Sequence, residues 1–438
     1  MRRLTESAAE RLIAEHSFEC GPPGFVGAAI DLPGPAAADA EDPFAGRGIN
    51  PAGPISEPLA ADGPGSLEGG GSPAGEVRRA LRHGFAAVRA GGSVTVSGPP
   101  SPGLESCVAR MSDDLATMPA IGVGGDAAVG IRVGLEAGLD GGGPLGLARR
   151  WRLAHTLAPV LAAAFANTPS ADDRPGGWRS VRAARHRDRP VLPGTPAGDP
   201  AETSPAPTDP ARTNPARTNP TPVSPAAISP CMADLGAVDP RWTGAEPYGI
   251  DSRTSWVTYA MAEPVPWLAG RPDNGDPALG AAGKGRSFRE WTRSGEPPTQ
   301  DDLLRHLDGL RPPVAARGHL ELDFADGQAG DGWRVVVAVV AVLLDDPVAA
   351  TAAEAATGEF AYAERVWERA ARDALTDEEL ATAARHCFLA AYAALARRGA
   401  PRDLRDAVAA FMERYVMRGR CPADDRLAAG RHRVIGTS

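Results

Sequence analysis

Residues 287–347 hold the clearest pattern in the chain and read SFREWTRSGEPPTQDDLLRHLDGLRPPVAARGHLELDFADGQAGDGWRVVVAVVAVLLDDP. Polar and apolar residues alternate over 319–324, which predicts a short strand. Successive strand side chains point to opposite faces, so His319, Glu321 and Asp323 share one face. The apolar residues between them share the other face and can pack on a core. The polar face is therefore the first place to look for a site.

Two further elements flank this strand. Residues 299–307 predict a helix, which ends before the turn that two prolines make at 312–313. After an acidic loop, residues 335–344 form the longest apolar run of the chain. A transmembrane helix needs about 20 apolar residues, so this run predicts a buried core segment and no membrane partner.

Composition excludes several classes of protein. The 438 residues carry a net charge of −9, which gives no reason to expect nucleic acid as a partner. Gly and Pro number 51 and 43, so we expect much loop. The five cysteines form no C-x-x-C pair and the histidines form no zinc pattern. Free thiols and an N-terminus without a secretion signal predict a cytoplasmic protein.

The N-terminal part predicts a helix over 5–16 and a strand over 25–32, which carries Asp31. A helix is expected over 76–86. Residues 88–100 then predict a hairpin that turns at Gly91 and Gly92.

The domain organisation follows from composition. Residues 1–192 and 251–430 are expected to form two parts of one domain, with 431–438 as a tail. Within the first part, 33–76 are Gly, Pro and Ala rich and predict loop or disorder. Residues 193–250 predict a disordered Pro-rich linker, in which the motif PARTN occurs twice.

The remaining elements are expected to be helices. Residues 143–169 give the strongest helical pattern, with a proline inside it at Pro159. Thr376 and Glu379 predict a capping box that opens a helix in the C-terminal third. A second helix follows, with an apolar stripe from Leu404 to Tyr415.

Three stretches together carry a family resemblance: GWRSVRAAR at 177–185, RPPVAARGHLELDFADGQAGDGW at 311–333 and ERYVMRGRCPADDRL at 413–427. The chain resembles the type 2 glutamate–cysteine ligases of actinobacterial ergothioneine biosynthesis. The resemblance implies an α+β fold like that of glutamine synthetase, in which an antiparallel sheet forms a funnel surrounded by helices. It also implies formation of γ-glutamylcysteine from glutamate and cysteine through a γ-glutamyl phosphate, with ATP and Mg²⁺.

The resemblance also assigns roles to residues. Arg182 and Arg317 stand at motif arginines expected near a substrate carboxylate or a phosphate. Asn167 stands at a pocket position, although its place near the end of the long helix makes a capping role the safer interpretation. Asp31 and Glu321 stand at carboxylates that would bind the metal, because magnesium prefers oxygen ligands.

Several positions depart from the family pattern. Ala29, Arg89 and Thr95 occupy positions where the family has acidic residues, and Asp323 occupies an arginine position. Arg132 stands where the family has glutamine, and a family segment is missing between residues 119 and 138.

Three hypotheses therefore stand side by side. The chain is an active ligase, or it is an inactive paralogue that is kept as a binding or regulatory subunit or is decaying. The third is that a related ligase partners the chain and supplies the site. Whether Arg89 and Asp323 form an ion pair is left open by the sequence.

Overall fold

The computed structural model describes residues 3–32, 77–88, 94–118, 130–140, 142–170, 177–189, 191, 251–268 and 285–435. All of them belong to one compact unit, Met1–Gly194 with Ile250–Ser438. The expected loop at 33–76, the linker at 193–250, the hairpin turn at 91–92 and Arg89 lie outside the described residues. The predicted division of the chain into two domain parts, a Pro-rich linker and a tail stays a prediction.

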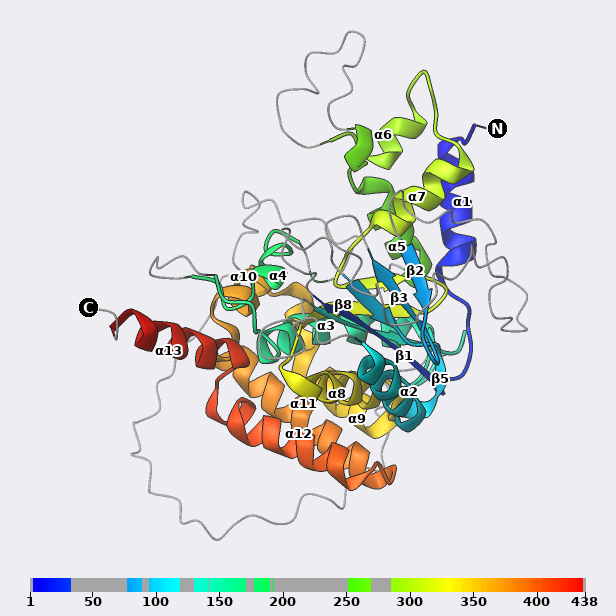
Figure 1. Ribbon diagram of the computed structural model, residues 1–438. Helices are drawn as coiled ribbons and strands as arrows, with labels where there is room; N and C mark the ends of the chain where they lie inside the picture. Colours follow the sequence, from blue (N-terminus) through cyan, green and yellow to red (C-terminus); the bar gives the residue numbers. More distant parts are fainter. Residues whose placement is uncertain are drawn as a thin grey trace, which may run out of the picture. The chain divides into compact units, whose positions relative to one another are not determined.

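One antiparallel sheet runs through this unit in the strand order β2-β3-β4-β1-β6-β8-β7, and β5 pairs with β1 at one end. Helices surround it, so the predicted α+β class is confirmed (Figure 1). The strands are β1 (Phe25–Leu32), β2 (Val77–Ala80), β3 (Phe85–Val88), β4 (Val94–Ser97), β5 (Ser101–Pro102), β6 (Gly130–Leu135), β7 (Val314–Ala316) and β8 (Leu320–Asp326).

The predicted strand over 25–32 is confirmed as β1, and its burial alternates along the chain. Val26, Ala28, Ile30 and Leu32 are buried on one face, whereas the residues between them are partly exposed. The bounds of β1 coincide with the predicted strand. The helix expected over 76–86 is wrong, because this segment forms β2 and the first half of β3, which pair with each other. A four-residue strand is too short to show a period, so only its pairing reveals it.

Helix α8 (Trp333–Asp345) contains the predicted apolar run and is buried on nearly every side. It packs against β6 and β1 on one side and against other helices on the other, which explains why it lacks a polar face. The other helices of the molecule's main body are α2 (Gly103–Thr117), α3 (Leu147–Ala164), α9 (Pro347–Thr357), α10 (Val366–Arg372), α11 (Glu378–Arg397) and α12 (Arg402–Arg414). In Figure 1 α8, α9, α11 and α12 lie below the sheet, whereas α10 lies to its left.

A second group of helices gathers around the N-terminal helix, as Figure 1 shows. The predicted helix over 299–307 is confirmed as α7, and its N-cap Thr299 forms a capping box with Asp302. The predicted helix over 5–16 is also confirmed as α1. The group comprises α1 (Glu6–Ser17), α5 (Ser252–Ala262), α6 (Phe288–Thr292) and α7 (Gln300–Gly309).

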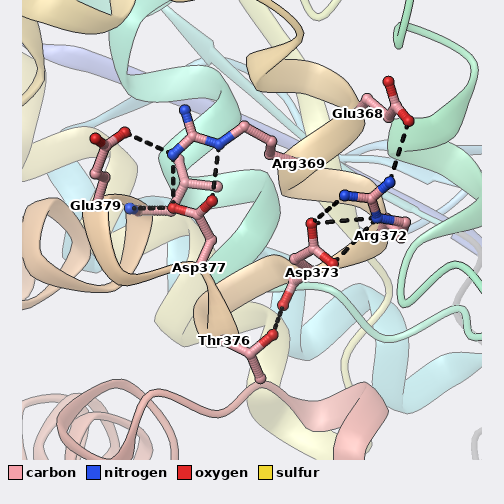
Figure 2. Close-up of polar contacts among 8 residues, drawn as sticks. Glu368, Arg369, Arg372, Asp373, Thr376, Asp377 and Glu379 are labelled. Atoms are coloured by element: carbon pink, nitrogen blue, oxygen red, sulfur yellow. Dashed lines mark hydrogen bonds and ion pairs between the residues drawn. The ribbon is translucent and has the colours of Figure 1, made fainter. Parts of the chain in front are cut away.

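The capping box predicted for Thr376 and Glu379 is wrong. Asp377 is the N-cap of α11, and its side chain accepts a hydrogen bond from the backbone N–H of Leu380. Figure 2 shows why: Arg369 binds both oxygens of Asp377, while the hydroxyl of Thr376 donates to the carbonyl of Asp373. An ion pair from the neighbouring helix α10 therefore fixes the cap one residue later.

The C-terminal motif RGRCPADD has a structural role at the start of α13 (Pro422–Ile435). Asp424 accepts hydrogen bonds from Arg179 and from the backbone N–H of Cys421. The backbone N–H of Ala423 donates to the carbonyl of Ala166 at 2.9 Å. The motif thus joins the C-terminal helix to the end of α3 and to the GWRS segment, three stretches far apart in sequence.

No single helix in the described part of the chain is long and apolar enough to cross a membrane. One pair, Gly330–Asp345 and Pro347–Tyr362, meets the length and composition criteria together but is bent by 96°.

The buried His155 of α3 predicts a pH-dependent stability. Burial lowers the pKa of His155 to about 4, against the smaller effect of its hydrogen bond to the Trp151 carbonyl. An unfolded chain, with a histidine pKa of about 6.5, binds a proton that the folded chain does not as the pH falls below 6.5. We expect the wild type to lose about 2 kcal/mol more unfolding free energy than His155→Gln between pH 7 and pH 5. Urea unfolding measures this, and parallel losses in the two proteins would contradict it.

Candidate functional site

The polar face of the sheet gathers the charged side chains that the sequence singled out. It lies opposite the face on which α2 and α8 pack. In register, Asp31 of β1 lies opposite Thr95 of β4 and Gly130 of β6, while Gly134 of β6 lies opposite Glu321 of β8. Three neighbouring strands, β1, β6 and β8, therefore bring their polar residues to one surface. The sequence predicted this face for β8 and the pairing unites it with β1.

Asp31 forms the first of three ion pairs on this face. Its Oδ1 atom accepts a hydrogen bond from Nη2 of Arg132 at 2.9 Å and another from the Thr95 hydroxyl at 2.7 Å. Both side chains of the pair are largely buried, at 13% exposure for Arg132 and 21% for Asp31. The carboxylate predicted as a metal ligand thus already has a cation beside it.

Arg182 and Asp323 form the second ion pair. Arg182 comes from the short helix α4 (Val181–Ala184), whose N-cap Ser180 accepts from the backbone N–H of Ala183. Its guanidinium lies over Gly130, where a Cβ atom would collide with it. Burial lowers the pKa of Arg182, although the nearby carboxylates oppose that shift. Asp323 therefore has a partner in Arg182, whereas its pairing with Arg89 lies outside the described residues.

Arg317 and Glu321 form the third ion pair. Nε of Arg317 donates to Oε1 of Glu321 at 2.8 Å, and its two Nη atoms donate to the carbonyls of Leu307 and Leu310. Burial alone would raise the pKa of Glu321, but the charge and hydrogen bond of Arg317 outweigh it and lower that pKa. The Arg317 guanidinium thus links the C-terminal end of α7 to strand β8.

Asn167 lies in a buried junction at the end of β8. Its backbone N–H donates to Oδ2 of Asp326 at 2.7 Å, and its side-chain amide donates to the carbonyl of Gly327 at 2.7 Å. Asp326 also accepts from the backbone and hydroxyl of Thr168 and from the Ser180 hydroxyl. Burial raises the pKa of Asp326 although these hydrogen bonds oppose the shift.

Sequence reasoning missed two residues of this arrangement as participants. Arg132 stood out only because it occupies a family glutamine position. No feature of the sequence indicates that it pairs with Asp31, because the pairing of β1 with β6 cannot be read from their distance along the chain. Asp326 was present in the DGQ of the quoted motif, which is the signal that could have identified it. The structure brings Asp31, Arg182, Arg317 and Glu321 to one face, with Asn167 at its margin. Their roles in substrate or metal binding stay predictions.

The described residues do not fit a magnesium site built by the protein. No group of three or more His, Cys, Asp or Glu side chains that could hold a metal ion occurs within the described ranges. Magnesium requires several oxygen ligands in near-octahedral geometry. Asp31 and Glu321 instead bind arginines, and these cations neutralise their charge.

A double-mutant cycle tests the pair between Arg182 and Asp323. We expect Arg182→Gln and Asp323→Asn each to lower the unfolding free energy by about 3 kcal/mol, because each leaves a largely buried charge uncompensated. The double variant is expected to cost clearly less than the sum of the two. Exposed Arg185→Gln, at the end of the same helix, is the control. Strictly additive losses would show that the two side chains do not interact.

Comparison with known proteins places the chain in a family. The model of glutamate–cysteine ligase family 2 matches residues 74–435. The chain is 29% identical over 391 residues to glutamate–cysteine ligase EgtA of Mycobacterium tuberculosis (strain H37Rv), covering 78% of this chain and 77% of that protein. It is 32% identical over 296 residues to glutamate–cysteine ligase EgtA of Mycolicibacterium smegmatis, covering 66% and 55%. The chain belongs to glutamate–cysteine ligase family 2, which implies the glutamine-synthetase-like fold and the use of ATP.

Proposed function

We propose that the chain joins the side-chain carboxylate of glutamate to the amine of cysteine at the expense of ATP, and that it does so on the polar face of the sheet. The observation that carries this is the family match over residues 74–435, which includes β6, β8 and α4. These elements supply Arg132, Arg182 and Glu321 to the polar face. The names of the mycobacterial relatives give the same reaction.

In the proposed reaction a carboxylate oxygen of glutamate attacks the γ-phosphorus of ATP, and ADP leaves. The amine of cysteine then attacks the acyl carbon of the γ-glutamyl phosphate, phosphate leaves, and the nitrogen loses a proton. Glutamate, ATP and the γ-glutamyl phosphate are anionic, and cysteine carries a carboxylate. Arg132, Arg182 and Arg317 would hold them by exchanging an internal carboxylate for a substrate carboxylate or phosphate.

The protein's own residues do not supply a magnesium site within the described part of the chain. The product would enter ergothioneine biosynthesis in the cytoplasm, as the resemblance implies.

A second function is favoured by a specific observation. The two implied metal ligands, Asp31 and Glu321, are each bound by an arginine. Ala29 of β1, which lies opposite Arg132 of β6, has no carboxylate that could bind a metal. A site that is neutralised internally suits an inactive paralogue that binds small molecules or a related ligase subunit. The two functions make opposite predictions about product formation.

The first test is product formation by the purified chain. With ATP, magnesium, glutamate and cysteine, we expect γ-glutamylcysteine by mass spectrometry and ADP release that requires both amino acids. Arg182→Gln is expected to lower kcat/KM by roughly tenfold to a hundredfold, because a charge-assisted hydrogen bond to an anion is lost. Arg185→Gln is the matched control. No product from a protein that melts cooperatively would reject the ligase and favour the inactive paralogue.

The second test asks whether Arg132 occupies the place of a cation. Without ATP, we expect magnesium to leave the melting temperature of the wild type unchanged. In Arg132→Gln, Asp31 loses its partner, so magnesium is expected to raise the melting temperature. Adding Asp31→Asn should abolish that rise. An equal rise in the wild type would show that Arg132 does not block a cation.

A further inference from the structure

Arg182 belongs to a helix that is too short to hold a side chain in place by itself. Helix α4 has four residues, and a single helical turn is unstable alone, because its formation fixes several residues for one hydrogen bond. The Arg182 side chain is nevertheless only 12% exposed, and its guanidinium lies over Gly130 on the polar face. Other parts of the chain must therefore hold α4 against the sheet.

Asp326, at the end of β8, supplies this support through Ser180. Its Oδ1 atom accepts a hydrogen bond from the Ser180 hydroxyl at 3.0 Å. The oxygen of that hydroxyl accepts in turn from the backbone N–H of Ala183 at 3.0 Å, as the N-cap of α4. Ser180 and Asp326 are each only 1% exposed, so the loss of either bond leaves a buried polar atom without a partner. A chain of hydrogen bonds thus runs from β8 to the helix that presents Arg182.

The orientation of the Asp326 carboxylate is fixed by its second oxygen. Oδ2 accepts from the backbone N–H of Asn167 at 2.7 Å, and from the backbone N–H and hydroxyl of Thr168 at 3.0 and 2.8 Å. These donors follow α3, which is buried along most of its length. The backbone N–H of Val181 also donates to the carbonyl of Thr168 at 3.0 Å. The carboxylate is therefore held by a rigid part of the core while it binds Ser180.

We propose that Ser180 and Asp326 are positioning residues for the reaction, and that they act through Arg182. The proposal rests on the proposed function, in which Arg182 binds an anionic group of a substrate. Arg182 must then exchange Asp323 for that group, which removes a direct link between α4 and β8. The bond from Ser180 to Asp326 persists during this exchange and keeps the guanidinium at the polar face. Charge-assisted hydrogen bonds depend on geometry, so a displaced guanidinium would bind the substrate less well.

Steady-state kinetics of the full chain with ATP, magnesium, glutamate and cysteine tests the proposal. Ser180→Ala is expected to raise the KM of one substrate by roughly tenfold and to change kcat less. That substrate should be the one whose KM Arg182→Gln also raises. In the Arg182→Gln background, Ser180→Ala should have no further effect on this KM, because no guanidinium is left to position.

Ser287→Ala is the matched control. Ser287 is the N-cap of another short helix, α6, and its hydroxyl likewise accepts from a backbone N–H of the first turn. This variant is expected to lower the melting temperature, because a helix cap is lost, and to leave every KM unchanged.

Asp326→Asn tests the other end of the bond. It is expected to raise the KM of the same substrate, because the charged acceptor of the Ser180 hydroxyl is lost. Two residues that act as a unit are not additive, so Ser180→Ala with Asp326→Asn should raise this KM no more than the larger single change. If Asp326→Asn does not fold, the Ser180 variants alone decide the question.

A measurement without substrates separates this proposal from the ligase function. The coupling between Arg182 and Asp323 is measured by urea unfolding of their double-mutant cycle, in the Ser180→Ala and Ser287→Ala backgrounds. We expect the coupling to fall by roughly half or more in the first and to persist in the second. A wild type that shows this pattern but makes no product would reject the ligase function and leave the positioning of Arg182 intact.

Two results would overturn the proposal. One is that the KM effects of Ser180→Ala and Arg182→Gln multiply in the double variant. The other is that Ser180→Ala leaves the coupling between Arg182 and Asp323 unchanged. Either result would show that the Ser180 hydroxyl stabilises the fold without positioning the arginine.

Discussion

The fold depends on how the charges of β8 are neutralised. Glu321, Asp323 and Asp326 stand on one strand in the middle of a packed molecule, where an unpaired carboxylate is costly. Each is compensated by a different part of the chain: Arg317, which also binds the end of α7; Arg182 of α4; and the hydrogen-bond donors at residues 167, 168 and 180. The strand thus fixes the positions of α4, α7 and the end of α3 through its polar side.

The same ion pairs neutralise the charges on the polar face. In a ligase, carboxylates and phosphates arrive with the substrates, and arginines stabilise them. Here the arginines already have partners from the protein, and Asp31 has Arg132 in the position of a cation. Catalysis on this face requires exchange of internal pairs for substrate groups. A role as an inactive binding subunit does not require this exchange, so the ion pairs would stay intact.

The opposite face of the sheet is stabilised by apolar burial and not by ion pairs. Between Arg334 and Asp345, helix α8 is entirely apolar and packs between the sheet and the other helices, so burial of apolar surface stabilises this side of the sheet. The polar groups at its C-terminal end, Asp345 with Arg150, lie where this layer meets α2 and α11. Strand β1 therefore contributes to both faces of the sheet, with Asp31 on the polar face and Val26 buried on the face that α2 and α8 cover.

Local sequence patterns predicted correctly the helices and strands that have a strong local signal. The period-2 pattern gave β1 and most of β8, and capping residues with helical periodicity gave α1 and α7. Motifs spread over the chain identified the family and its α+β class. Local signals failed at β2 and at the N-cap of α11, where pairing with β3 and the ion pair of Arg369 decided the outcome. Which charged side chains pair with each other depends on the packing of the whole chain. Arg132 lies 101 residues from Asp31 and Arg182 lies 141 residues from Asp323, and no local pattern encodes a contact that strand pairing and packing create.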